Sequence, residues 1–219
     1  SSGGSDLAYV LPVGYRTSQC NSLYYNPARV YVVPREQAGD YMPTPVFTNA
    51  PEDGYSQPTS GRVNLATNFK AFHNGSRQAS STTGLADDAA QPAYYYVYTK
   101  SGTPDQLPYG AAPCTDMESA LFPTTTSFGA GHTAPAGGGT WTRTQVTTDA
   151  EKQNFAIWYS YYRTRMGMLK ASVSQAFADP VADGFRIGLV SMSPLNSSGA
   201  PGNATSGIDA DKFLRIDEF

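Results

Sequence analysis

The sequence predicts a mixed α/β protein, in which a long segment rich in loops and strands precedes a helix and a buried strand. Apolar residues recur at helical spacing over residues 149–177, and a continuous apolar run follows at Phe185–Met192. A continuous apolar run is typical of a strand covered on both faces. Most of the 21 glycines and 16 prolines precede residue 149. We therefore expect two parts, residues 1–148 and residues 149–219.

The composition is typical of an exported protein. Charged residues make up 15% of the 219 residues, below the usual quarter, and there are 15 tyrosines. The formal net charge is −3 without a basic stripe, so we expect no nucleic-acid partner. No apolar run is long enough for a transmembrane segment.

The two cysteines, Cys20 and Cys114, are far apart in the sequence. One long-range disulfide fits an exported protein, and two buried free thiols are the alternative. Two cysteines and two histidines at these separations are too few ligands for a metal site.

Three strands are expected before the helix, separated by turn signals. They are Ala28–Val33 after an Asn-Pro turn, the aromatic and β-branched run within Ala93–Lys100, and Trp141–Val146. Arg77–Gln91 and Ser119–Thr140 lack such patterns and are expected to be irregular.

A single helix is expected from about Asp149 to Phe177. Thr148 is a good N-cap with Glu151 three residues later, and Asp179-Pro180 is the expected stop. Gly167 interrupts this helix, which a close packing neighbour would explain. The apolar stripe comprises Phe155, Trp158, Tyr162, Met166, Leu169, Val173 and Ala176–Phe177.

Several side chains of this helix lie off the stripe. Tyr159 and Tyr161 would line a partner interface or lie beneath the preceding segment. Arg163, Arg165 and Lys170 are expected to form a solvated face.

Motifs of catalysis are missing from the sequence. It has neither a glycine-rich phosphate loop nor a Gly-x-Ser-x-Gly elbow. His73 and His132 are expected in surface loops, and Asp209 and Asp211 alone are a weak calcium signal. We therefore expect no enzyme, and assign no catalytic, cofactor-binding or metal-binding residue.

The stretch QNFAIWYSYYRTRMGMLKASVSQAF, Gln153–Phe177, resembles a signature of PilY/PilC-type proteins at the tip of bacterial type IV pili. Three further stretches are similar to that family in the same order, namely Cys20–Pro34, Ala93–Lys100, and Phe185–Met192 with the later FLRIDEF. The signature residues are Asn154, Phe155, Trp158, Tyr159, Tyr161, Tyr162, Arg163 and Arg165.

The resemblance implies part of a von Willebrand factor A-like, Rossmann-type unit with a long insertion. In that family a first strand carrying Asp-x-Ser-x-Ser precedes the insertion, the first large helix and the second strand. This chain fits the last three of these, and Asp-x-Ser-x-Ser does not occur in it. A divalent metal site would therefore need residues outside this chain. We expect an internal fragment whose helix and buried strand expose an apolar face.

The resemblance also implies a function in pilus assembly, surface adhesion and twitching motility, without enzymatic activity. Expected partners are the rest of the parent chain, minor pilins or tip subunits, and host or surface glycans. The expected location is the pilus tip or outer surface of a bacterium. The alternative is a secreted carbohydrate-binding or structural β-rich module unrelated to pili.

Overall fold

The structure is a computed structural model, and it describes residues 12–35, 40–56, 60–71, 90–108, 110–122 and 128–182. The chain divides into two compact units, Ser1–Ala171 and Ser172–Phe219. Of the second unit, residues 172–182 are described, and they are helical.

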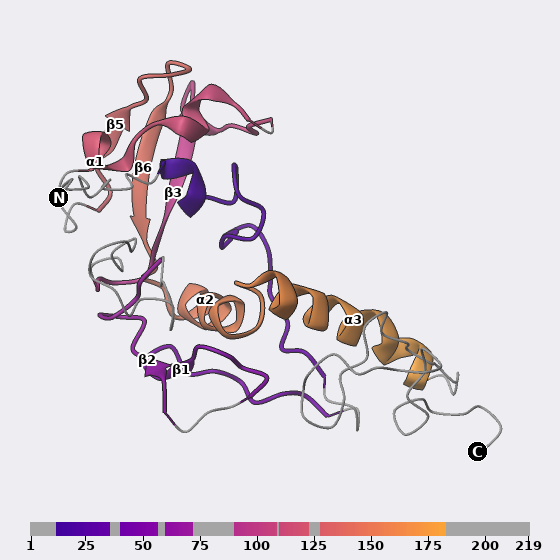
Figure 1. Ribbon diagram of the computed structural model, residues 1–219. Helices are drawn as coiled ribbons and strands as arrows, with labels where there is room; N and C mark the ends of the chain where they lie inside the picture. Colours follow the sequence, from indigo (N-terminus) through magenta and orange to yellow (C-terminus); the bar gives the residue numbers. More distant parts are fainter. Residues whose placement is uncertain are drawn as a thin grey trace, which may run out of the picture. The chain divides into compact units, whose positions relative to one another are not determined.

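The largest sheet in the described part has four antiparallel strands in the order β4-β3-β6-β5. Its long central pair is β3 (Tyr94–Lys100) and β6 (Thr140–Gln145), which lie side by side in Figure 1. The flanking strands are β4 (Thr103–Pro104) and β5 (Gly131–Thr133). The two strands expected at 93–100 and 141–146 are thus confirmed.

The aromatic and β-branched residues of β3 explain its central position. Tyr94, Tyr96 and Tyr98 project from one face, and each is at most 1% exposed. The strand ends where expected, at Ser101-Gly102, whose φ angles of 54° and 81° turn the chain into β4.

Shorter elements surround this sheet. A second sheet pairs β1 (Ala50–Pro51) with β2 (Arg62–Val63). The described residues also form the 3-10 helices η1 (Val13–Arg16) and η3 (Ala112–Thr115) and the helix α1 (Glu118–Leu121). The expectation that 119–140 is irregular is therefore wrong in part, because it contains the end of α1, all of β5 and the first residue of β6.

The segment expected as a strand at Ala28–Val33 forms no ladder. Its side chains still alternate, with Val30 82% exposed, Tyr31 5% and Val32 47%. The strand predicted after the Asn-Pro turn is therefore wrong, and side chains of a helix, described below, bind the backbone of this segment where a neighbouring strand would.

Two helices replace the single expected one. They are α2 (Asp149–Tyr161) and α3 (Arg165–Ala182). The N–H groups of Tyr162 and Arg163 both donate to the carbonyl of Trp158, which ends the regular ladder. The expected start is confirmed, because the Thr148 hydroxyl accepts from the Glu151 N–H.

The start of α3 explains Gly167. The Thr164 hydroxyl caps α3 by accepting from the Gly167 N–H at 3.0 Å. A Cβ on Gly167 would lie 2.6 Å from the carbonyl oxygen of Tyr161, so the expected close neighbour is the end of α2 itself. The expected stop at Asp179-Pro180 is wrong, since α3 continues to Ala182; a proline removes one helical hydrogen bond and bends a helix without always ending it.

The core is an aromatic cluster in which α2 lies between the large sheet and β1–β2 (Figure 1). Tyr25 is at its centre, with the rings of Tyr31, Tyr95, Phe155 and Trp158 at centroid distances of 4.8 to 5.9 Å. Such pairs contribute about 0.5–1.5 kcal/mol each beyond the area they bury.

The prediction that this part of the chain exposes an apolar face is wrong for α2. Phe155, Trp158 and Tyr162 are at most 3% exposed, because the residues before 149 enclose them. On α3, Met166 and Leu169 are 62% and 57% exposed, as expected of that half of the stripe.

The coarse expectation of a mixed α/β protein agrees with this structure. The buried strand at Phe185–Met192, on which the von Willebrand A-like unit depends, lies outside the described residues. A division at residue 148 stays a prediction; α2 belongs to the same compact unit as the residues before it.

Candidate functional site

The signature residues of α2 bind the backbone of a segment that precedes them by more than a hundred positions. Asn154 uses its whole side-chain amide for this purpose. Its Oδ1 accepts from the Tyr31 N–H at 2.8 Å, and its Nδ2 donates to the Arg29 carbonyl at 2.8 Å and to the Tyr25 hydroxyl at 3.2 Å.

Further side chains from Gln153 to Arg163 repeat this pattern. Each donates a hydrogen bond to a backbone carbonyl of residues 23–52. The donor–acceptor pairs are Gln153–Pro45 at 3.1 Å, Trp158–Leu23 at 3.0 Å, Tyr161–Pro43 at 2.6 Å, Tyr162–Val32 at 2.6 Å and Arg163–Glu52 at 3.0 Å.

These bonds explain how residues 23–35 and 40–45, which form no β-ladder, pack against a helix. Buried carbonyl groups must be hydrogen-bonded, and in residues 23–45 α2 supplies side-chain partners for several of them. The signature therefore acts as a scaffold that fixes the path of residues 23–35 and 40–52, and we name these residues of α2 and its C-terminal end the signature scaffold. The spacing of apolar residues could not predict this role. It shows which face of the helix is apolar, but it does not show which groups the polar atoms of Trp158, Tyr161 and Tyr162 contact.

The structure also decides between the alternatives for Tyr159 and Tyr161. Both are buried beneath the preceding segment, at 3% and 1% exposure, and Phe69 and Tyr55 pack on their rings. Arg163 is half-buried, and its guanidinium also lies 4.5 Å over the Tyr159 ring. Arg165 and Lys170 are exposed, as expected.

Two hydrogen bonds tie the strand β3 to the first turn of α2 and to the Cys20–Pro34 stretch. The Tyr95 hydroxyl donates to the Glu151 carboxylate at 2.8 Å, and the Tyr24 hydroxyl donates to the Tyr94 carbonyl at 2.8 Å. The three described stretches that carry the family resemblance thus meet in one core.

Burial of this core predicts an alkaline unfolding transition. Burial raises the pKa of Tyr25 and of Tyr159 from 10.0 to about 12. The unfolded chain therefore loses these protons first, so the stabilisation is complete below pH 10 and is lost as the pH rises from 10 to about 12. We expect tyrosinate absorbance and loss of circular dichroism to rise together in that window. Ionisation of all tyrosines near pH 10 with the fold intact would contradict this expectation.

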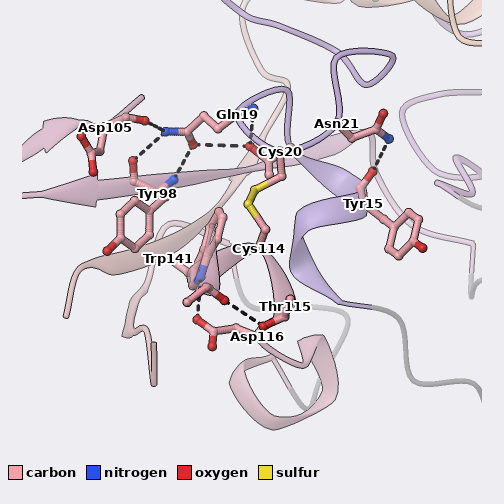
Figure 2. Close-up of a disulfide and its surroundings, with 12 residues drawn as sticks. Tyr15, Gln19, Cys20, Asn21, Tyr98, Asp105, Cys114, Thr115, Asp116 and Trp141 are labelled. Atoms are coloured by element: carbon pink, nitrogen blue, oxygen red, sulfur yellow. Dashed lines mark hydrogen bonds between the residues drawn. A yellow bond between two sulfur atoms is a disulfide. The ribbon is translucent and has the colours of Figure 1, made fainter. Parts of the chain in front are cut away.

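The predicted disulfide is present between Cys20 and Cys114, across a sequence separation of 94 residues (Figure 2). The neighbouring Gln19 uses its side-chain amide to bind both backbone groups of Tyr98 in β3, accepting from the N–H at 2.7 Å and donating to the carbonyl at 3.0 Å. The disulfide therefore joins the start of the described chain to η3 beside the large sheet.

Reduction of this disulfide is expected to lower the free energy of unfolding by about 3–4 kcal/mol, because a long loop in the unfolded chain is released. Urea unfolding with and without reductant measures the difference. The Cys20→Ala/Cys114→Ala double variant should match the reduced protein and be insensitive to reductant. Equal thermal stability of the oxidised and reduced protein would argue against a stabilising role.

A buried ion pair lies near η1 and was not expected from the sequence. The Arg16 guanidinium binds the Glu118 carboxylate of α1 and donates to the Tyr94 hydroxyl at 2.9 Å. Tyr96 donates to the same carboxylate at 2.6 Å. The side chains of Arg16 and Glu118 are only 7% and 13% exposed. No local pattern links two residues 102 positions apart.

A pocket of about 300 Å³ opens where α2 ends and α3 begins, and we name it the junction pocket. Its polar lining includes Glu52, Asp53, Ser160, Arg163 and Lys170. Its remaining lining residues are Tyr55, Tyr159, Tyr161, Thr164, Met166 and Gly167.

Other candidate residues do not assemble into a catalytic or metal site in the described part of the chain. His132 is half-buried in β5 against Phe122, with a centroid distance of 4.5 Å, so the expectation of a surface loop is wrong for it. His73, Asp209 and Asp211 lie outside the described residues. Within those residues, groups of three or more potential metal ligands are absent. Nor does any described helix have the length and apolar character needed to cross a membrane.

Comparison with known proteins identifies relatives that match about three quarters of the chain or more. The chain is 30% identical over 171 residues to the type IV pilus biogenesis factor PilY1 of Pseudomonas aeruginosa strain UCBPP-PA14. The aligned region covers 74% of this chain and 12% of the relative. It is 28% identical over 176 residues to PilY1 of strain PAK, covering 75% of this chain and 12% of the relative. With PilY1 of strain PAO1 the identity is 25% over 209 residues, covering 92% of this chain and 15% of the relative.

The chain thus spans less than a sixth of the length of these relatives. No family model matches the sequence, and no solved structure matches the fold. The agreement with PilY1 extends well beyond the helical signature, because it covers about three quarters of the chain or more. We conclude that this chain is PilY1-like over most of its length.

Proposed function

We propose that the chain acts in type IV pilus biogenesis, as a folded part of a PilY1-like protein, and that it does so without enzymatic activity. The observation that carries the proposal is that the sequence similarity to PilY1 and the packing of the signature residues point to the same folded unit. The relatives whose printed name describes pilus biogenesis match most of the chain, and the signature residues hold its core together.

The finer proposal is that α2 and α3 lie where the first large helix of a von Willebrand A-like unit would be, with residues before 149 as its insertion. Support comes from the order of the resembling stretches along the chain. Any divalent metal of such a unit would bind residues outside this chain, which would itself need no cofactor.

We further propose an extracellular location at the pilus tip or outer cell surface, with roles in adhesion and twitching motility. Minor pilins, tip subunits, the rest of the parent chain and surface glycans are the proposed partners. The disulfide supports export, since such bonds persist in oxidising compartments.

An immunoblot of mechanically sheared surface filaments tests the proposal. An antibody to this chain should detect a band in the pilus fraction of the source organism, and the band should be lost from that fraction in a non-piliated strain. A band that is free in the medium and indifferent to piliation would overturn the proposal.

A matched pair of variants tests the part played by the fold. Cells whose protein carries Trp158→Ala should yield less sheared pilin than the wild type, because the core that Trp158 fills is weakened. Lys152→Ala, a change of a half-buried residue outside the core on the same helix, should leave the amount of pilin unchanged. Equal piliation in both would show that this fold is dispensable for assembly.

The alternative remains a secreted carbohydrate-binding module. It relies on aromatic platforms, but both tryptophans are buried, with Trp141 at 0% and Trp158 at 3% exposure. Tyr15 and Tyr41 are exposed at 59% and 57% and are the candidate platforms in the described part. Glycan binding by the purified chain that is lost in Tyr15→Ala or Tyr41→Ala, and that persists in a metal chelator, would favour this alternative.

A further inference from the structure

The junction pocket collects hydrogen-bond donors at the start of α3. Arg163 is fixed there by its own bonds, since Nε donates to the Tyr159 carbonyl at 3.1 Å and one terminal nitrogen donates to the Glu52 carbonyl at 3.0 Å. A guanidinium has five N–H donors, so others stay available to a ligand. Lys170 is placed by its ammonium group, 4.8 Å over the centre of the Tyr55 ring.

The N-terminus of α3 adds further hydrogen-bond donors to the junction pocket. Thr164 caps only the Gly167 N–H by its side chain, and the regular ladder starts with the Met168 N–H donating to the Thr164 carbonyl. The first-turn N–H groups of Arg165 and Met166 have no acceptor within an α-helix, and their dipoles favour negative charge. Met166 and Gly167 line the pocket.

Ser160 provides an independent sign that the pocket is built for a ligand. It lines the pocket and is only 5% exposed, and its Oγ has no hydrogen-bond partner among the described residues. A buried hydroxyl without a partner is destabilising, and a ligand could supply the missing partner.

The lining of the pocket also carries negative charge. Glu52 and Asp53 belong to the segment that Arg163 holds, and Asp53 is fixed by accepting from the Tyr55 N–H at 3.0 Å. A simple anion would be attracted by the two cations and repelled by these two carboxylates. A ligand with both a carboxylate and an ammonium group would complement the whole lining.

We propose that the junction pocket binds a zwitterion of amino-acid size. Its carboxylate accepts from Arg163, Lys170, Ser160 and the start of α3, and its ammonium group faces Glu52 and Asp53. A pocket of about 300 Å³ holds one amino acid with its side chain. This inference is independent of the role in pili and concerns a ligand of the chain itself.

Calorimetric titration of the purified 219-residue chain with three related probes tests the charge requirement. L-Leucine carries both charges, N-acetyl-L-leucine only the carboxylate, and L-leucinamide only the ammonium group. We expect leucine to bind about tenfold more tightly than either blocked form, because each blocked form leaves one charged side of the pocket unpaired. Equal affinity of all three, or binding of none, would overturn the proposal.

A fourth probe distinguishes a free amino acid from the end of a peptide. Gly-Gly-leucine separates the two charges, so it should bind no better than N-acetyl-L-leucine. Tighter binding of the tripeptide than of leucine would contradict the compact zwitterion and assign the pocket to a polypeptide terminus.

Variants separate binding from folding. Ser160→Ala should weaken leucine binding about tenfold while leaving the stability of the free protein equal or higher, because an unpaired hydroxyl is removed. Lys170→Met should also weaken binding, and Lys152→Met, at a half-buried residue of α2 outside the pocket lining, should not. Unchanged binding in both Ser160→Ala and Lys170→Met would overturn the proposal.

Discussion

Replacing Trp158 by alanine is expected to lower the free energy of unfolding by about 3–5 kcal/mol. The indole is 3% exposed and packs on Tyr24 at 5.2 Å and on Phe155 at 4.9 Å. Its Nε1 also donates to the Leu23 carbonyl at 3.0 Å. The change thus opens a cavity and leaves the part-buried Leu23 carbonyl without its donor. Guanidinium unfolding followed by circular dichroism measures the loss.

Two further variants divide this effect into its parts. Trp158→Phe keeps an aromatic ring but removes the donor, so it should cost less, about 1–3 kcal/mol. Leu169→Ala on α3, where the side chain is 57% exposed, should change stability by no more than about 0.5 kcal/mol. Similar losses for Trp158→Ala and Leu169→Ala would contradict a core role for the signature scaffold.

Breaking the buried ion pair is the second large effect. Arg16→Met should lower the free energy of unfolding by about 3–5 kcal/mol, because it leaves the Glu118 carboxylate buried with only neutral donors such as the Tyr96 hydroxyl. Urea unfolding at neutral pH measures the loss.

The double variant Arg16→Met/Glu118→Leu tests whether the loss arises from the unpaired charge. Replacing both partners removes both buried charges, so most of the stability should return. As a control, Lys152→Met breaks the exposed Lys152–Asp149 pair, 3.2 Å long, and should cost at most about 1 kcal/mol. Additive losses from the single Arg16 and Glu118 changes would show that the two charges are not coupled.

Local patterns predicted the elements that depend on neighbouring residues alone. The strand at 94–100 follows from a run of aromatic and β-branched side chains, and the start of α2 follows from the Thr148 cap. The composition predicted the disulfide. Few charged residues and two distant cysteines are typical of exported proteins, in which disulfides persist.

The break between α2 and α3 was not predictable from periodicity, because the apolar stripe runs on through it. The break is set by packing from another part of the chain. A Cβ on Gly54 would lie 2.4 Å from the Tyr161 ring, and the Gly54 N–H donates to the Ser160 carbonyl at 2.9 Å. Thr164 then starts a second helix with its own cap.

The sequence by itself predicted the mixed α/β class and the resemblance to a family of pilus proteins, and it led to the expectation of an exported protein. These depend on composition and on the identity of contiguous residues. Only the tertiary structure decided what the signature does and where a ligand could bind. The polar tips of Asn154, Trp158 and Tyr162 reach carbonyl groups more than a hundred positions away, and the junction pocket joins residues 52–55 to residues 159–170. Such pairings are fixed by the path of the chain in space, which no local pattern encodes.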